Sequence, residues 1–131
     1  MSVVDASVLV EFLSGGEHRE AAEHAIGRER WVWAPALVDA EVGNALRRQV
    51  RAKEISASKA GEALEDLLEM RLQRVPHRNL VDRAWRLRDN ISFYDALYVA
   101  LAEGLGAPLL TLDKKLARVP GVRAEIELVG T

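Results

Sequence analysis

Four carboxylates in this 131-residue sequence stand among apolar residues, whereas most of the 20 acidic side chains lie in charged company. A carboxylate in an apolar setting is costly unless something pairs with it. Carboxylates that lie a few ångströms apart also repel one another, so a cluster does not stay fully ionised without a cation. The four are Asp5 after Val3-Val4, Glu41 between Ala40 and Val42, Asp95 in ISFYDALYVALAE, and Asp113 after LLTL.

If these side chains converge, their oxygen atoms form a ligand set for a hard cation. Oxygen ligands without His or Cys favour Mg²⁺ or Mn²⁺. A water bound to such an ion is more acidic and becomes a usable nucleophile. Because phosphodiester oxygens can complete the coordination, the set indicates metal-assisted hydrolysis of a phosphodiester.

Each of the four acids also has a purely structural interpretation. Asp95 lies three residues after Ser92, which is the spacing of a capping box, although Glu is the usual partner. Asp5 and Asp113 could each precede a helix and favour its dipole. Glu41 could pair with an arginine. A capping role for Asp95 is compatible with a metal-facing carboxylate, and four separate coincidences are less expected than one shared site.

Strands and helices alternate along the sequence, which predicts a parallel sheet with helices on both faces. Ligands of such folds bind beyond the carboxyl ends of the strands, where Asp5 and Asp113 are expected. Ser7 is expected to cap the first helix and Pro35 to open the third. The expected strands are 2–4, 31–34, 72–75, 108–112 and 123–129, and the expected helices are 7–13, 17–26, 35–46, 56–70, 80–88, 92–105 and 114–119.

Length and composition describe one domain, residues 1–131, with 49% hydrophobic residues and no cysteine. The lack of cysteine fits a reducing cytoplasm, where we expect the protein to act. No apolar run approaches the ~20 residues of a membrane span, and Asp5 interrupts the first apolar run too early for a signal peptide.

Two other classes of phosphate chemistry lack their motifs. Neither GxxxxGK[ST] nor GxGxxG occurs, so nucleotide-binding loops of these types have no support. Ser7 stands where haloacid-dehalogenase-like enzymes carry their second aspartate, which weakens that interpretation.

The net charge of −2 argues neither for nor against nucleic acid as a partner. The distribution is uneven, since RRQVRAK at 47–53 contains no acid and EALEDLLE at 62–69 contains no base. One interpretation is that the two segments are solvated faces of neighbouring helices that attract each other. The alternative is that the basic segment, 47–53, forms an edge that binds phosphates.

Histidine and tryptophan give weaker signals. His18 and His24 are six residues apart, which does not place them on one helix face, and His77 follows Pro76 in an expected loop. All three are expected at the surface. Trp31, Trp33 and Trp85 could stack on bases, but core or interface packing is the simpler expectation.

Four segments together resemble a known family. VVDASVLVEFL, then Glu41 soon after Pro35, then SFYDALYVALAE, then LLTLDKKLA occur in this order between Val3 and Leu116. The pattern resembles PIN-domain ribonucleases and, more narrowly, VapC-type toxins of bacterial toxin–antitoxin pairs. It implies an α/β fold with three α/β/α layers and a central, mostly parallel sheet. It also implies a Mg²⁺/Mn²⁺ site of Asp5, Glu41, Asp95 and Asp113, with the hydroxyls of Ser7 and Thr111 nearby.

The resemblance further implies an endoribonuclease that cuts structured RNA, often tRNA or rRNA, and so stops translation. Such toxins are usually homodimers and are silenced by a small antitoxin whose C-terminal segment lies over the active site. Apolar residues of the first two helices could form a groove for that partner or simply pack on the sheet. They are Val8, Leu9, Phe12, Leu13, Ala21, Ala22 and Ala25.

In the expected mechanism, Asp5, Asp95 and Asp113 bind the ion directly, and Glu41 either binds it or holds a water. Basic side chains must offset the acidic pocket, and the candidates for RNA-phosphate contacts are Arg47, Arg48, Arg51, Lys114 and Lys115. Two other classes stay open. One is a non-catalytic PIN-like module that binds RNA or protein. The other is a metal-dependent nuclease acting on DNA, although this short chain lacks the helical elements that thread DNA.

Overall fold

Five parallel strands form one sheet in the order β3-β2-β1-β4-β5 in a computed structural model that describes residues 1–130. Each strand has three or four residues. The expected α/β fold with a parallel sheet is confirmed. The strands are β1 Ser2–Val4, β2 Val32–Pro35, β3 Leu72–Val75, β4 Leu109–Thr111 and β5 Ile126–Leu128.

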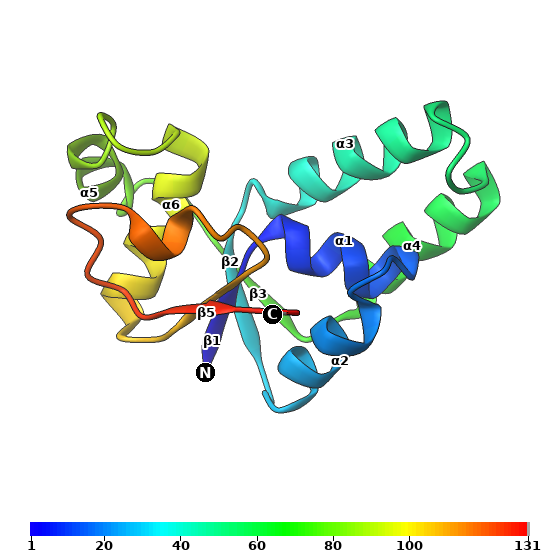
Figure 1. Cartoon of the computed structure of the whole chain (residues 1–131), viewed down its shortest axis with the longest axis horizontal. Helices are drawn as coiled ribbons and strands as arrows, with labels where there is room; N and C mark the ends of the chain where they lie inside the picture. Colours follow the sequence, from blue (N-terminus) through cyan, green and yellow to red (C-terminus); the bar gives the residue numbers. More distant parts are fainter. Residues whose placement is uncertain (131) are drawn as a thin grey trace.

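Helices lie on both sides of this sheet, as Figure 1 shows. Four helices, α1 to α4, pack together on one side, and α5 and α6 pack together on the other. Helices α3 and α4 form a hairpin that extends away from the sheet and is called the α3–α4 arm below. The helices are α1 Ala6–Ser14, α2 Arg19–Gly27, α3 Val38–Arg51, α4 Ala57–Glu69, α5 Val81–Arg86 and α6 Phe93–Leu105, and a 3₁₀ turn, η1, spans Leu116–Arg118.

Helix α6 is apolar on every side because protein surrounds it. Residues 96–102 are all buried, and the helix contacts β1, β2 and β4 as well as α5. Ser92 caps its start by accepting a hydrogen bond from the backbone N–H of Asp95 at 3.1 Å. Gly106 ends it in the left-handed conformation, with φ of 64°, which glycine adopts without strain. Asp95 therefore lies in the first turn, where the helix emerges from the core.

Two expectations about helix starts were wrong. Pro35 is the last residue of β2, and α3 begins only at Val38. Pro35 lies opposite Val75 of β3 and beyond the registered pairs between β2 and β1, at the end of the strand, where a missing N–H interrupts no later bond of the ladder. The cap of α1 is Asp5 rather than Ser7, since the Asp5 carboxylate accepts from the N–H of Val8 at 3.2 Å.

The apolar faces of α1 and α2 pack into the core. Val8, Leu9, Ala22 and Ala25 are buried, and the other three residues of this set pack against them. The simpler interpretation, core packing, is therefore confirmed for these residues, and the alternative of a groove for a partner helix gains no support from them.

Two of the three tryptophans lie outside the core, where interface packing stays the expectation for them. Trp31 is 40% exposed and Trp85 58% exposed, whereas Trp33 packs partly against the core. His77 also has a structural role, since its Nε2 accepts from the N–H of Leu37 at 3.0 Å, just before α3 begins. No helix of the described residues is long and apolar enough to cross a membrane.

One ion pair ties the α5–α6 side to the end of the chain. Arg83 donates to both carboxylate oxygens of Glu103, at 2.6 and 3.1 Å, and to the carbonyl of Gly121 at 2.7 Å. The N–H of Arg123 donates to the same carboxylate at 2.7 Å. Removing Arg83 would therefore leave a mostly buried carboxylate with one of its donors lost.

We expect Arg83→Met to lower the free energy of unfolding by about 1–3 kcal/mol, because the partly buried Glu103 carboxylate loses its charged, bidentate partner. Urea unfolding monitored by circular dichroism measures this. Arg86→Met, an exposed position on the same helix, is the matched control. Equal effects of the two changes would contradict a specific role for the pair.

Candidate active site

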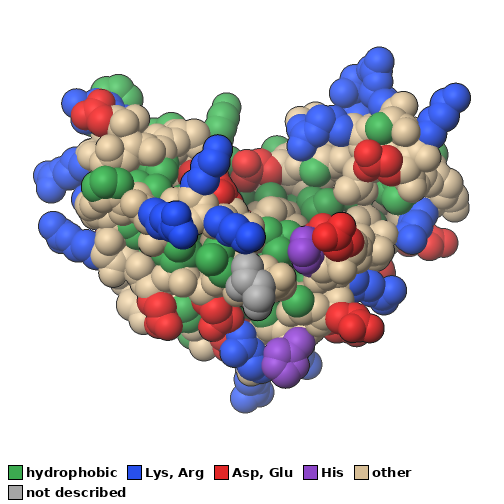
Figure 2. Space-filling view, in the orientation of Figure 1, with side chains coloured by type: hydrophobic (Ala, Val, Ile, Leu, Met, Phe, Trp, Pro, Cys, Tyr) green, Lys and Arg blue, Asp and Glu red, His purple; other side chains and the backbone are tan. Residues whose placement is uncertain are grey.

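The four acids converge at the carboxyl edge of the sheet. Asp5 directly follows β1, and Asp113 follows the neighbouring strand β4 by two residues. Glu41 lies in the first turn of α3, after β2 on the other side of β1, and Asp95 lies in the first turn of α6. Figure 2 shows acidic side chains at the floor of the hollow between the two sides of the molecule.

Electrostatic coupling also shows that the acids are neighbours. The pKa of Asp95 is raised by burial first and then by the charge of Asp113. The charge of Asp95 contributes in turn to the raised pKa values of Asp5 and Glu41, for which burial is the largest cause. The fold therefore brings the four carboxylates to the same edge of the sheet, and their role as a shared metal site stays a prediction.

Asp5 is the best anchored of the four. Its Oδ1 accepts from the hydroxyl of Ser7 at 2.5 Å and from the N–H of Val8 at 3.2 Å, and its Oδ2 accepts from the hydroxyl of Thr111. Its residue is only 9% exposed. Burial raises the pKa of Asp5 to about 6, although the three hydrogen bonds oppose the rise.

Ser7 and Thr111 connect Asp5 to the segment after β4. The Thr111 hydroxyl accepts from the N–H of Asp113 at 3.0 Å, and the Ser7 hydroxyl accepts from the N–H of Leu112 at 3.3 Å. Both hydroxyls thus hold Asp5 and at the same time fix the backbone that carries Asp113. The resemblance implied these two hydroxyls near the site, and the structure places both there.

Glu41 has a partner that the sequence did not indicate. The hydroxyl of Tyr98 donates to its Oε1 at 2.6 Å. Tyr98 is 2% exposed and lies three residues after Asp95 on α6. Its signal in the sequence was a phenol within the apolar run ALYVALA of this helix, but nothing there pointed to a partner 57 positions away.

The structural interpretations of these acids are partly realised as well. Asp5 caps α1, and Asp113 accepts from the N–H of Lys115 at 2.9 Å. Glu41 does not pair with an arginine as one alternative held. Among residues 1–130, the ion pairs involve other acids, so the four carboxylates have no lysine or arginine as partner.

The donors fit a divalent cation in their chemistry. All are carboxylate oxygens, three of the four have raised pKa values, and none forms an ion pair with a lysine or arginine of the described residues. Within residues 1–130, no three histidine, aspartate or glutamate side chains stand in an arrangement that already holds a metal. An ion would therefore have to draw the carboxylates closer together.

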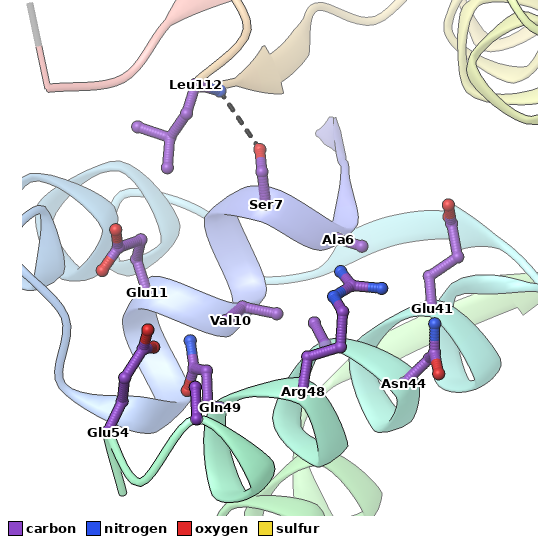
Figure 3. Close-up of a pocket in the computed structure, with 12 residues that line it drawn as sticks. Ala6, Ser7, Val10, Glu11, Glu41, Asn44, Arg48, Gln49, Glu54 and Leu112 are labelled. Atoms are coloured by element: carbon purple, nitrogen blue, oxygen red, sulfur yellow. Dashed lines mark hydrogen bonds between the residues drawn. The ribbon is translucent and has the colours of Figure 1, made fainter.

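A cleft of about 590 Å³ opens beside Glu41, between α1 and α3, and is drawn in Figure 3. Ser7 and Leu112 lie on one side of it and Asn44 and Arg48 on the other, and the Arg48 side chain points into the space. Arg48 is thus separated from its sequence neighbours, because Arg47 and Arg51 line a different groove, between α3 and α4. Lys114 and Lys115 are exposed directly after Asp113.

The fold and the site together match one family of proteins. The family model described as "PIN domain" matches residues 2–122, so the chain belongs to the PIN-domain family. Ribonuclease VapC1 of Mycobacterium tuberculosis is 47% identical over 128 residues, which cover 97% of this chain and 96% of that protein. Ribonuclease VapC12 of the same species is 40% identical, with 98% and 99% covered. Within the family, the chain groups with the VapC ribonucleases.

Solved structures agree on the fold. A toxin–antitoxin complex from Klebsiella pneumoniae contains a chain that matches with a TM-score of 0.71 at 18% identity, with 97% of this chain and 96% of that chain covered. The protein PAE2754 from Pyrobaculum aerophilum matches with a TM-score of 0.69 at 25% identity, with 95% and 81% covered. The expected resemblance and fold class are confirmed, and the roles of individual site residues stay predictions.

Proposed function

We propose that this protein is a Mg²⁺- or Mn²⁺-dependent endoribonuclease that acts in the cytoplasm as the toxin of a toxin–antitoxin pair. In this proposal it cuts structured RNA, either tRNA or rRNA, and so inhibits translation. The observation that carries the proposal is the convergence of Asp5, Glu41, Asp95 and Asp113 without a basic partner. Membership of the VapC ribonucleases supports the reaction class.

The four acids would hold the ion, which would acidify a water and offset the charge on the scissile phosphate. The chain's own residues prepare this site. Ser7 and Thr111 orient Asp5 through hydrogen bonds, and the N-cap at Ser92 fixes the first turn of α6, which carries Asp95. We take residues 1–131 as one domain, because the four acids come from both ends of the chain.

Cleavage of purified tRNA and rRNA with added Mg²⁺ or Mn²⁺ tests this function. We expect cutting that EDTA abolishes and that added metal restores. A folded protein that binds RNA without cutting it under any of these conditions would favour the non-catalytic module. Cutting of single-stranded DNA in preference to RNA would favour the DNA nuclease instead.

Arg48 is the candidate phosphate contact that the cleft favours. We expect Arg48→Ala to weaken RNA binding and to reduce the slope of log K against log salt concentration by about 1, because one phosphate contact is lost. Fluorescence anisotropy with labelled RNA at several salt concentrations measures this. Arg47→Ala is the matched control, since Arg47 lines the groove on another side of α3. If Arg48→Ala and Arg47→Ala lose the same RNA affinity, or if the wild-type affinity does not change with salt, Arg48 is not a specific phosphate contact.

The α3–α4 arm offers a docking surface for the proposed antitoxin. A groove of about 340 Å³ runs between the two helices, with Leu46 and Ala60 buried at its base and Arg47 and Arg51 among its lining residues. On α4, Leu64 is 38% and Leu68 73% exposed, one helical turn apart. This surface suits an amphipathic helix with acidic flanks.

The proposed homodimer has a separate candidate surface. Val81 and Trp85 lie one turn apart on α5, with exposed fractions of 41% and 58%. Phe93 and Tyr94 are exposed at the start of the neighbouring helix α6. Large exposed apolar side chains gathered on two packed helices are typical of protein interfaces.

A further inference from the structure

Tyr98 is a phenol buried among aliphatic side chains. Its residue is 2% exposed, and its hydroxyl donates to Oε1 of Glu41 at 2.6 Å. A buried phenol needs a polar partner, and a carboxylate makes a strong one. The partner here is one of the four acids and lies on α3, whereas Tyr98 lies on α6. The bond therefore links the two groups of helices that Figure 1 shows on the two sides of the sheet.

The spacing on α6 gives this bond its significance. Asp95 and Tyr98 are three residues apart and share a helix face. One face of α6 therefore supplies an acid to the site and the donor that holds a second acid. The pKa of Tyr98 is raised far above that of a free phenol, by burial first and then by its bond to Glu41. The hydroxyl consequently remains a donor throughout the physiological pH range.

Glu41 depends on this one donor. Asp5 has three hydrogen-bond donors, but within residues 1–130 the Glu41 carboxylate has Tyr98 alone. A glutamate has three rotatable side-chain bonds, and this one is only half-buried at the edge of a wide cleft. Without the phenol, its carboxylate would sample several orientations in the cleft.

We propose that Tyr98 is a positioning residue that fixes the Glu41 carboxylate for divalent metal binding. The bond engages Oε1 and leaves Oε2 without a donor among residues 1–130, so Oε2 is the oxygen that would be available to an ion or to a water held by an ion. The inference rests on the proposed function, since it assumes that the four acids bind a metal. Packing alone does not explain a tyrosine at this position, because Phe would fill the same space in the core without the hydroxyl.

Isothermal titration with Mn²⁺, without RNA, tests the proposal. We expect Tyr98→Phe to bind Mn²⁺ about 10-fold more weakly or worse, which is the usual effect of losing a group that orients a metal ligand. Tyr94→Phe is the matched control, because it removes the same hydroxyl from a 61% exposed tyrosine on the same helix. It is expected to bind like the wild type. Circular dichroism verifies that each variant is folded.

A double-mutant cycle separates positioning from a general effect on the fold. If Tyr98 acts through Glu41, then Tyr98→Phe combined with Glu41→Gln should bind Mn²⁺ no more weakly than Glu41→Gln alone. Wild-type affinity in Tyr98→Phe, or a loss that adds fully to that of Glu41→Gln, overturns the inference. A wild-type protein that binds no Mn²⁺ overturns the proposed function and the inference with it, so the two failures are distinguishable.

Discussion

Replacing Asp95 with Asn is expected to reduce metal-dependent RNA cleavage by on the order of 10²–10³-fold, the size of loss that follows removal of one strong electrostatic group from an active site. The change keeps the size of the side chain but removes the charge that faces Asp5, Glu41 and Asp113. The N-cap of α6 is unaffected, because Ser92 bonds to the backbone of residue 95 rather than to its side chain. Cleavage of tRNA with Mn²⁺, compared at equal protein concentration, measures the loss.

The same variant should behave in the opposite way in a stability assay. In the metal-free protein, burial and the charge of Asp113 penalise the ionised form of Asp95. Asp95→Asn removes that penalty, so we expect it to unfold at a higher temperature than the wild type in EDTA. Asp89→Asn, which changes an exposed acid just before α6, is the control for both assays. Equal cutting by wild type and Asp95→Asn would point to a contaminating nuclease or to another site.

Metal binding is expected to weaken by on the order of 10-fold or more between pH 7.5 and pH 5. The reason is Asp5, whose pKa is raised to about 6 and which must lose its proton before its oxygens can bind a cation. Isothermal titration with Mn²⁺ across this range measures the effect. Asp5→Asn should bind more weakly at pH 7.5 and lose most of the pH dependence. An affinity that stays constant down to pH 5 would show that Asp5 is not a ligand.

The stability of the metal-free protein should change with pH in the reverse sense. Between pH 3.8 and about 6, folded Asp5 holds its proton more tightly than unfolded Asp5. The contribution of Asp5 to stability therefore falls as pH rises through this window and is constant above it. A difference of roughly two pKa units corresponds to about 3 kcal/mol at most. Urea unfolding of wild type and Asp5→Asn in EDTA, at pH 4.5 and pH 7.5, isolates this contribution.

The sequence predicted the four acids because each was a charge in an apolar run. The rule that ligands bind beyond parallel strand ends then placed Asp5 and Asp113 at one edge. Side-chain partners could not be predicted in the same way. Tyr98 and Glu41 form a hydrogen bond only because α3 and α6 flank the same strand ends, and no local sequence pattern predicts that contact. Arg47 and Arg48 are adjacent in sequence, yet the packing of α3 sends them to different surfaces.

The errors at Ser7 and Pro35 have a related cause. Asp5 and Ser7 are both good capping residues, and the end of β1 decides which of them stands at the first helical turn. Whether Pro35 opens a helix or ends a strand depends on where the neighbouring strand stops pairing. Both outcomes depend on contacts between segments that are distant along the chain, whereas helix and strand periodicity is a local property.

Because the four acids come from β1, α3, α6 and the loop after β4, no fragment of the chain carries a complete site. The first acid is residue 5 and the last is residue 113, so the proposed metal site exists only once nearly the whole polypeptide has emerged from the ribosome and folded. On the proposed function, a nascent, truncated or partly unfolded molecule would therefore lack nuclease activity. On this proposal, nuclease activity depends on complete folding of the chain. A protease that removes unfolded copies would therefore remove only inactive ones.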